Sequence, residues 1–346
     1  MRTDVPANSR AQTEVVDSRM PSPVARAMVF VQRPIVLLTV LAIVAAATIV
    51  LFLTVGIVGS PSFAIPFRAR KVVAMVIVAF AIGISTVLFQ TITDNRILTP
   101  SIMGFDSLYV LIQTVVVFFF GSTALAVADP RVSWVVEVAL MVAFSTLLFQ
   151  WLFAGVRRSI HLLVLVGIVF GVLFRSVSSL FQRMLDPASF AVLQDSFFAS
   201  FNAVDEDLVL ISGIVVVIVS TIALRLVRVF DVIGLGESHA TGLGVDHRRV
   251  VTLMLVLIAV LVAVSTALVG PVTFFGLIVS NLAYALVRTH RHASILPATV
   301  LLGVICLVGG QLVLERAFGL DTALSVIVEF VGGILFIVLL VRRGVR

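Results

Sequence analysis

Residues 235–245 read LGESHATGLGV, a polar segment with three glycines that lies between two long apolar runs, 207–227 and 249–269. A bilayer crossing needs about 20 mostly apolar residues, so this segment is too short and too polar to span a membrane. Its length and composition predict about two turns of surface helix, held at the membrane face by the two flanking spans. A helix in that position is suited to binding a water-soluble partner.

The rest of the chain has the composition of a multi-pass helical membrane protein. Of its 346 residues, 60% are hydrophobic and 12% are charged, whereas globular domains carry about 25% charged residues. The apolar runs are continuous, unlike the short alternating segments of a membrane barrel. We therefore predict an all-α polytopic membrane protein with about ten transmembrane helices, at 35–57, 72–90, 105–121, 133–154, 160–181, 207–227, 249–269, 272–289, 293–313 and 322–342.

The tight joint at Gly270-Pro271 predicts a sharp turn between the seventh and eighth spans. Residues 1–34 are polar, and the apolar run after them is longer than the core of about 7–15 residues in a signal peptide. We therefore predict a disordered cytoplasmic tail, 1–34, followed by one transmembrane domain, 35–346.

The basic residues predict the orientation of the chain. With both termini in the cytoplasm, most of the 24 basic residues fall on the cytoplasmic side, as the positive-inside rule requires. The scattered arginines thus orient the chain in the lipid bilayer of the cytoplasmic membrane, and we expect no binding to nucleic acid.

The sequence motifs of several classes of chemistry are absent. Lys71 is the only lysine and follows no glycine, so there is no phosphate-binding loop of the Gly-Lys-Ser/Thr type. Gly234-Leu235-Gly236 resembles the start of a dinucleotide loop, but His239 occupies the position of the third glycine. Cys306 is the only cysteine, which excludes an internal disulfide and a cysteine metal cluster.

The histidines also give no strong candidate for a metal site. His290 and His292 are a weak metal pair, and we interpret them as solvated loop residues, together with the other three histidines, His161, His239 and His247. We therefore predict no catalytic residue, no metal site and no cofactor in this chain.

Four segments, in order and spacing, resemble one family. Residues 68–108 contain Gln90, then NRILTP at 95–100 and MGF at 103–105; residues 270–283 read GPVTFFGLIVSNLA, and residues 320–344 form a last apolar span. Together with 235–245, they resemble the FecCD-type permease subunits of ATP-binding cassette (ABC) importers for iron-siderophores and vitamin B12. Ser280-Asn281 replaces the family's Pro-His, and Asn-Arg-Ile-Leu replaces Asn-Pro-Leu-Ala. The sequences of these segments are most similar to those of permeases for catecholate or petrobactin-like ferric siderophores.

The resemblance implies a type II ABC importer permease fold and a set of partners. These would be a cytoplasmic ABC ATPase dimer, a second permease copy or a paralogue, an extracytoplasmic substrate-binding protein and a ferric siderophore as substrate. A vitamin B12 or haem permease is the alternative within the family. Outside it, the alternatives are a proton-coupled secondary transporter using Glu137 or Glu329, and a non-transporting scaffold or enzyme.

The resemblance also assigns residues to the ATPase contact, in a coupling loop at about 228–248. An acid in the first turn suits the helix dipole, which favours Glu237, and glycines can end the helix before the next span. Ser238, His239, Ala240 and Thr241 are expected to face the partner. The predicted coupling residues are Gly236, Glu237, Ser238, His239, Ala240, Thr241, Gly242 and Gly244.

Basic residues on the outer side are candidates for docking the binding protein. Arg68, Arg70 and Lys71 lie together against the positive-inside trend, and Arg316 is expected apart from them, on the opposite lobe. The resemblance implies that Arg68, Arg70 and Arg316 pair with acidic residues of the binding protein. Exposed pairs contribute about 0–1 kcal/mol each, yet they steer association. Snorkelling of the arginines to lipid headgroups is the alternative.

Small residues and carboxylates within spans are candidates for the transport pathway. Gly167 and Gly171 have the four-residue spacing that permits close helix packing, and Gly332 with Gly333 is expected to act similarly. The resemblance places both of these spans beside the pathway.

The two intramembrane carboxylates, Glu329 and Glu137, are interpreted differently. Glu329 is either a substrate or gating contact or a buried structural acid, because a charge inside a span must face protein or water. Glu137 is interpreted as structural. Arg175 could pair with either one.

Overall fold

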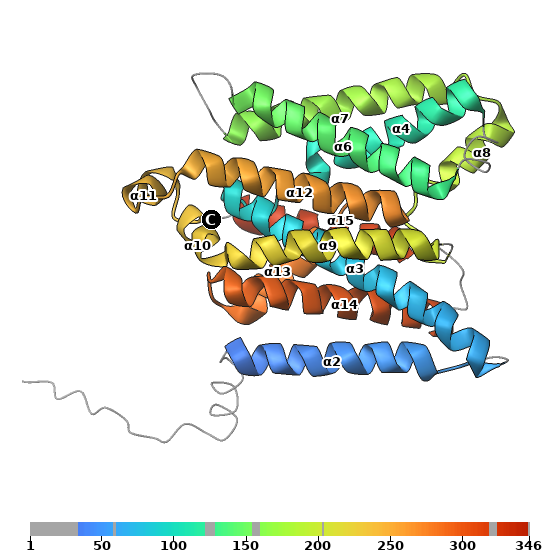
Figure 1. Cartoon of the computed structure of the whole chain (residues 1–346), viewed down its shortest axis with the longest axis horizontal. Helices are drawn as coiled ribbons and strands as arrows, with labels where there is room; N and C mark the ends of the chain where they lie inside the picture. The colour runs from blue at the N-terminus through green and yellow to red at the C-terminus, as the bar shows by residue number, and fades with distance from the viewer. Residues whose placement is uncertain are drawn as a thin grey trace, which may run out of the picture.

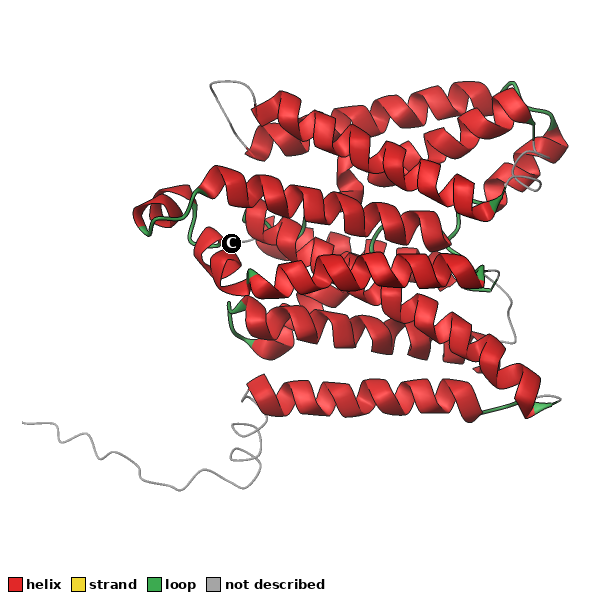
Figure 2. Ribbon diagram, viewed as in Figure 1, coloured by secondary structure: helices red, strands yellow, loops and turns green. Residues whose placement is uncertain are grey.

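The computed structural model describes residues 34–57, 60–121, 129–153, 160–202, 204–317 and 324–344, and the regular elements in these ranges are helices (Figure 2). The predicted tail lies outside the described residues except for Pro34. The elements are α2 Pro34–Thr54, α3 Pro61–Thr93, the 3-10 helix η1 Pro100–Met103, α4 Phe105–Phe120, α6 Pro130–Phe153, α7 Ile160–Gln182, α8 Pro187–Asp195, α9 Glu206–Arg225, α10 Val227–Ile233, α11 Glu237–Gly242, α12 His247–Val269, α13 Phe275–Val287, α14 His292–Ala317 and α15 Leu324–Gly344.

Each of the ten predicted spans overlaps a helix, although residues 154 and 322–323 lie outside the described residues. Seven of the described helices are long and apolar enough to cross a membrane, namely α2, α3, α6, α7, α9, α12 and α14. The other three predicted spans correspond to the shorter apolar helices α4, α13 and α15. The prediction of an all-α, multi-pass membrane protein is therefore confirmed.

The helices lie side by side and define two faces of the molecule (Figure 1). The start of α2, the short helices α10 and α11 and the chain's C-terminal end lie at one face, called here the α11 face. The α2–α3 connection and α8 lie at the opposite face, called here the α8 face (Figure 1). The two ends of the described chain thus share one side of the bundle, as the prediction of two cytoplasmic termini requires.

The long helix α3 is the centre of the bundle. Its 33 residues span about 50 Å at 1.5 Å per residue, more than the hydrocarbon core of about 30 Å. It packs against α2, α9, α12, α13 and α14. The sequence predicted only 72–90, and the helix begins earlier, with Pro61 in its first turn, where proline is tolerated, and with Pro66 inside it.

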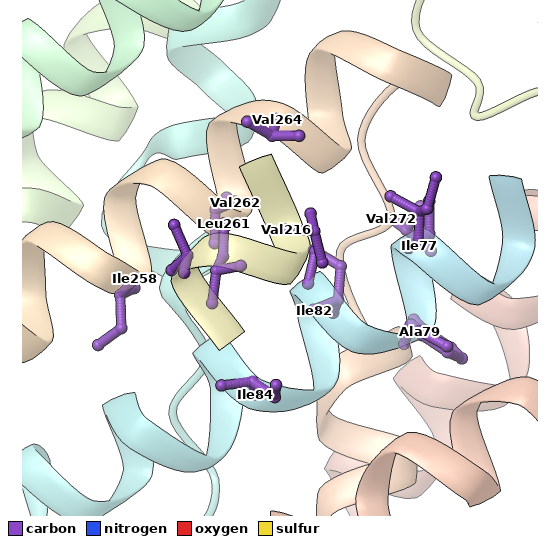
Figure 3. Close-up of a cluster of buried hydrophobic side chains, with 14 of the residues drawn as sticks. Ile77, Ala79, Ile82, Ile84, Val216, Ile258, Leu261, Val262, Val264 and Val272 are labelled. Atoms are coloured by element: carbon purple, nitrogen blue, oxygen red, sulfur yellow. The ribbon is translucent and has the colours of Figure 1, made fainter. Parts of the chain in front are cut away.

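Apolar side chains fill the space between α3 and its neighbours. Ile77, Ile82 and Ile84 of α3 are buried in one cluster with side chains from α9 and α12, including Val216 and Leu261 (Figure 3). On the opposite side, α3 meets α14 and α13 at small residues. A Cβ atom added to Gly303 would lie 3.1 Å from the Ala79 Cβ. Small residues allow helix backbones to approach this closely within a membrane.

Two of the spans begin after a non-helical approach segment. Gly104, with φ 92°, separates η1 from α4, and residues 270–274 connect α12 to α13, starting at Gly270 with φ 98°. The Thr273 hydroxyl donates a 2.8 Å hydrogen bond to Asp106 in the first turn of α4. The predicted sharp turn at Gly270 is present, and α13 is shorter than the predicted 272–289 because this approach uses its first residues.

Substitution of Gly104 tests this packing. We expect Gly104→Ala to lower the free energy of unfolding by about 1–3 kcal/mol or more. Its φ disfavours a side chain, and the new Cβ would lie 2.8 Å from the Gly171 Cα. The measurement is unfolding in mixed detergent micelles, followed by tryptophan fluorescence. Gly333→Ala is the matched control, because a Cβ there meets nothing within 4 Å. Equal stability of the two variants would contradict the packing.

Candidate functional site

The α11 face presents two short helices in place of the predicted single loop. The span α9 ends at Arg225, α10 begins after Leu226, and α11 covers only Glu237–Gly242. The predicted surface helix of about two turns is present within 235–245, as the six residues of α11. The sequence analysis did not predict α10. Its signal was the apolar spacing of Val227, Phe230 and Ile233, which are buried.

α10 is anchored in the bundle by apolar and polar contacts. Phe230 is fully buried and Ile233 nearly so. Beside them, Asp231 accepts hydrogen bonds from the backbone N–H of His292 at 2.8 Å and from its ring Nδ1 at 2.7 Å. The interpretation of His292 as a solvated loop residue was wrong, because its side chain is 6% exposed. This contact between α10 and the start of α14 had no signal in the sequence.

The exposed surface of α11 contains most of the predicted coupling residues. Gly236 precedes the helix with φ 90°, and Glu237 lies in the first turn. Glu237, Ser238, His239 and Thr241 are exposed. Ala240 is buried, so the prediction that it faces a partner was wrong. One side of any surface helix must pack against the protein, and here α11 packs on α10 and α12.

The end of α11 also differs in detail from the prediction. Gly242 is its last residue, and the backbone reverses at Gly244, which has φ 82°. Leu235 and Leu243, on either side of the helix, are 57% and 64% exposed. These two leucines add an apolar component to the surface, which the sequence analysis did not assign to it.

The residues that carry the family resemblance meet at one carbonyl oxygen. The Gln90 side chain donates to the Arg96 oxygen at 2.7 Å and to the Ser280 hydroxyl at 3.0 Å. Asn281 donates to the same Arg96 oxygen at 3.0 Å. The Arg96 guanidinium lies over the Tyr284 ring, 4.4 Å from its centroid. These contacts hold the segment before η1 against α13.

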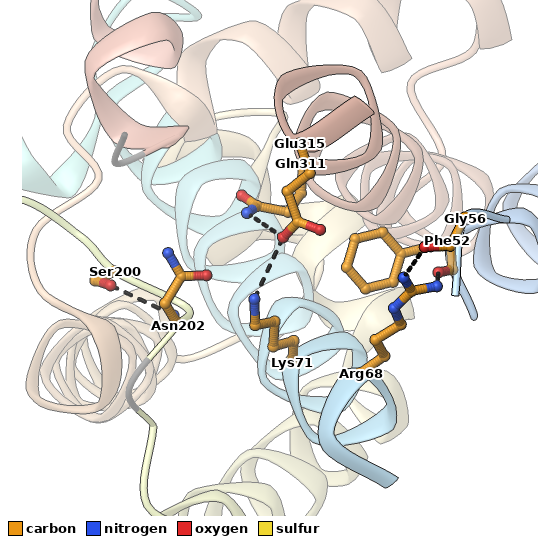
Figure 4. A network of polar contacts seen from close by, with 8 residues as sticks. All are labelled: Phe52, Gly56, Arg68, Lys71, Ser200, Asn202, Gln311 and Glu315. Atoms are coloured by element: carbon orange, nitrogen blue, oxygen red, sulfur yellow. Dashed lines mark hydrogen bonds and ion pairs between the residues drawn. The ribbon is translucent and has the colours of Figure 1, made fainter. Parts of the chain in front are cut away.

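At the opposite, α8 face, the predicted docking arginines have partners within the chain. Arg68 donates to the carbonyls of Phe52, Leu53, Val55 and Gly56, at 2.8–3.4 Å, and so closes the C-terminal end of α2 (Figure 4). Arg70 pairs with Glu206 at 2.6 Å. Lys71 pairs with Glu315 at 3.3 Å, and Gln311 also donates to that carboxylate (Figure 4).

Arg316 lies beside this group and not on an opposite lobe. A Cβ atom on Gly56 would lie 2.7 Å from the Arg316 guanidinium, and Gly56 is also the residue whose carbonyl Arg68 binds. The predicted separation of the two arginines was therefore wrong. The α2–α3 connection and the end of α14 are adjacent at this face, which the sequence could not indicate.

The candidate pathway glycines make close contacts within the chain. A Cβ on Gly171 would lie 3.0 Å from the Gly104 Cα, and one on Gly167 would lie 3.1 Å from the Met103 Cβ. α7 therefore packs on η1 and the start of α4. Gly332 packs against Phe274, whereas Gly333 meets no neighbour. The role of these glycines in a pathway stays a prediction.

The intramembrane carboxylates have polar neighbours. Glu137 accepts a 2.8 Å hydrogen bond from Gln113, which fits a structural acid. Glu329 is half-buried on α15, with Asp106 as its charged neighbour. Arg175 lies near Asp106 and donates to the Ser107 hydroxyl at 3.4 Å. Asp106 was not considered as its partner in the sequence analysis.

The described helices form a multi-pass membrane bundle that carries an exposed, mostly polar helix, α11, on one face. The family pattern of the FecCD transport family matches residues 34–342, nearly the whole described chain. The chain belongs to the FecCD transport family.

Individual relatives support this membership. The petrobactin import system permease protein YclO of Bacillus subtilis is 47% identical, over 83% of this chain and 91% of that protein. The petrobactin import system permease protein FatC of Bacillus anthracis is 38% identical, over 83% and 81%. A solved metal-chelate-type ABC transporter in an inward-facing conformation has the same fold, with a TM-score of 0.77 and 23% identity, over 88% of this chain and 97% of that one.

Cysteine labelling tests the surface of α11. In a Cys306→Ser background, we expect Ser238→Cys and Thr241→Cys to react rapidly with a membrane-impermeant maleimide, whereas Ala240→Cys reacts slowly. Ser238 and Thr241 are exposed, while Ala240 has 0% exposure. Met184→Cys, 65% exposed at the α8 face, is the control that reacts from the opposite side of the membrane. Equal reactivity at 240 and 241, or labelling of 184 and 238 from one side, would contradict this arrangement.

A second test separates the two outer arginines. We expect Arg68→Lys to lower the free energy of unfolding by about 1–3 kcal/mol, since an ammonium group cannot satisfy the same spread of carbonyls. Arg70→Lys should change it by less than about 1 kcal/mol, because the Arg70–Glu206 pair is exposed. Detergent unfolding measures both, and a larger loss for Arg70→Lys would contradict the assignment of Arg68 as the cap of α2.

Proposed function

We propose that the chain is the transmembrane permease subunit of an ABC importer that takes up a ferric siderophore of the petrobactin type across the cytoplasmic membrane. The observation that carries the proposal is the family membership, combined with the likeness to petrobactin import permeases of two Bacillus species. The chain supplies the conduit, and ATP hydrolysis belongs to a separate partner.

The α11 face supports binding of a cytoplasmic ATPase dimer. Glu237, Ser238, His239 and Thr241 form an exposed polar surface, flanked by the exposed Leu235 and Leu243. Protein–protein interfaces combine polar and apolar side chains, and both kinds are exposed on this surface. The same face carries both ends of the described chain (Figure 1), which supports cytoplasmic termini.

The α8 face supports docking of an extracytoplasmic substrate-binding protein. Arg316 is exposed there, beside Arg68, and Arg70 is 38% exposed although it pairs with Glu206. Because the Arg68 guanidinium binds carbonyls at the end of α2, we assign the main attraction for acidic residues of the partner to Arg316 and Arg70. Such charges act chiefly on the rate and orientation of association.

A second permease copy or a paralogue would complete the conduit. The glycines of α7 pack against η1 and the start of α4 in the same chain. The other side of α7 leaves Leu165, Val169 and Val172 exposed. On α15, Phe330 and Ile334 are exposed as well. We propose that part of these apolar faces contacts the partner permease and that the remainder contacts lipid.

Reconstitution tests the proposed function. The chain is placed in proteoliposomes with its ATPase, its partner permease and the binding protein, and accumulation of iron-labelled petrobactin is measured. We expect accumulation that needs ATP and the ATPase, and that excess vitamin B12 or haem does not compete away. Accumulation without the ATPase that depends on a proton gradient would refute the proposal and favour a secondary transporter. Competition by vitamin B12 or haem would refute the assigned substrate.

The contact surface has its own test. We expect Gly242→Trp to reduce ATP-dependent uptake at least about tenfold by blocking the ATPase. The permease itself should fold normally, because a Cβ at Gly242 meets nothing within 4 Å. Co-purification with the ATPase is the direct measurement, and Met184→Trp at the exposed opposite face is the matched control. Full uptake by Gly242→Trp would place the ATPase contact elsewhere.

A further inference from the structure

A chain of hydrogen bonds, centred on the buried side chain of His292, joins α10 to two of the long helices. Asp231 Oδ1 accepts from the backbone N–H of His292, at 2.8 Å, and from its ring Nδ1, at 2.7 Å. The first N–H groups of a helix have no partner within that helix. Asp231 therefore closes the start of α14 from another element, and its carboxylate lies at the end of the helix that favours negative charge.

The other side of the His292 ring contacts α3. Its Nε2 lies 2.7 Å from the Thr91 hydroxyl, which also lies 2.8 Å from the Val87 carbonyl. Because Nδ1 faces a carboxylate, that nitrogen donates. Nε2 either accepts the Thr91 proton or, in a protonated ring, donates to the Thr91 oxygen. The contact with Thr91 survives in both cases.

Packing around the three residues makes the connection stiff. The Phe230 ring is fully buried and lies 6.2 Å from the His292 ring, edge to face. Gly234, just after α10, lies against Thr91, whose methyl group would be 3.8 Å from an added Cβ. The residue before Thr91 is Gln90, which holds the Arg96 carbonyl and so the segment that leads into η1.

α11 itself buries little of its surface against the bundle. Ala240 is its buried residue, whereas Glu237, Ser238, His239 and Thr241 are exposed. A force applied to α11 therefore reaches the spans through its two neighbours along the chain, α10 before it and α12 after it. Of these two, α10 is the helix that is linked by side-chain hydrogen bonds to the start of α14 and, through His292, to α3.

We infer that Asp231, His292 and Thr91 are positioning residues that transmit movement of α10 and α11 into α3 and α14. The inference rests on the proposed function, since it assumes that the ATPase acts on α11. Hydrogen bonds to a carboxylate are short and directional, so a shift of α10 displaces the start of α14 or the end of α3. α3 then carries the displacement across the membrane towards Arg68, Arg70 and Lys71.

The test compares transport with ATP hydrolysis in the reconstituted importer. His292→Phe keeps a ring of similar size and removes both side-chain hydrogen bonds. We expect siderophore uptake per ATP hydrolysed to fall about tenfold, in the usual range of coupling between sites. The complex should still assemble and hydrolyse ATP. His292→Gln, which can both donate and accept, should restore most of the ratio.

Two controls make the outcome specific. His290→Phe, two residues away and exposed, should leave the ratio unchanged, and Thr91→Val should lower it in the same direction as His292→Phe. A wild-type ratio for His292→Phe would overturn the inference. Equal losses of uptake and hydrolysis, or failure of Gln to rescue, would also overturn it and leave His292 as a packing residue. If the wild-type complex shows no ATP-driven uptake, the proposed function fails instead.

Discussion

The hydrocarbon core of a membrane cannot hydrogen-bond to an exposed backbone, and this constraint governs where the chain can leave the helical conformation. It does so before α4 and before α13, in both cases inside the bundle. Several polar groups around these breaks have hydrogen-bond partners on other helices. The Arg96 carbonyl accepts from Gln90 and Asn281, and Thr273 donates to Asp106. The two interrupted spans are thereby fixed to each other and to α3.

The same contacts explain why this chain tolerates its departures from the family pattern. Ser280 and Asn281 occupy the positions where the family pattern has proline and histidine. The Ser280 hydroxyl accepts from Gln90, and the Asn281 amide donates to the Arg96 and Leu277 carbonyls. A proline at 280 would supply no such hydroxyl. The departures form a hydrogen-bonded set of their own, which keeps the segment before η1 attached to α13.

α3 connects the α11 face to the α8 face. Near its C-terminal end, Gln90 and Thr91 contact the segments that lead to η1 and to α10, α11 and α14. Near its N-terminal end, Arg68, Arg70 and Lys71 reach α2, α9 and α14. A helix that is buried over most of its length transmits displacement with little loss, because close-packed interiors are hardly compressible. In the proposed importer, this helix therefore links the ATPase side to the side of the binding protein.

The sequence by itself determined the all-helical class, the ten spans and a polar surface helix within 235–245, because span length, charge distribution and glycine positions are local properties. It also identified the family, since Gln90, NRILTP and SNLA keep their order and spacing. Only the tertiary structure decided that Ala240 points inward, that Arg68 caps α2, that Arg316 lies beside it and that His292 is buried between Asp231 and Thr91. Each of these depends on which helices are neighbours. Hydrophobicity cannot specify those neighbours, because in a membrane every span is apolar on most of its surface, and close packing and a few polar contacts choose the partner.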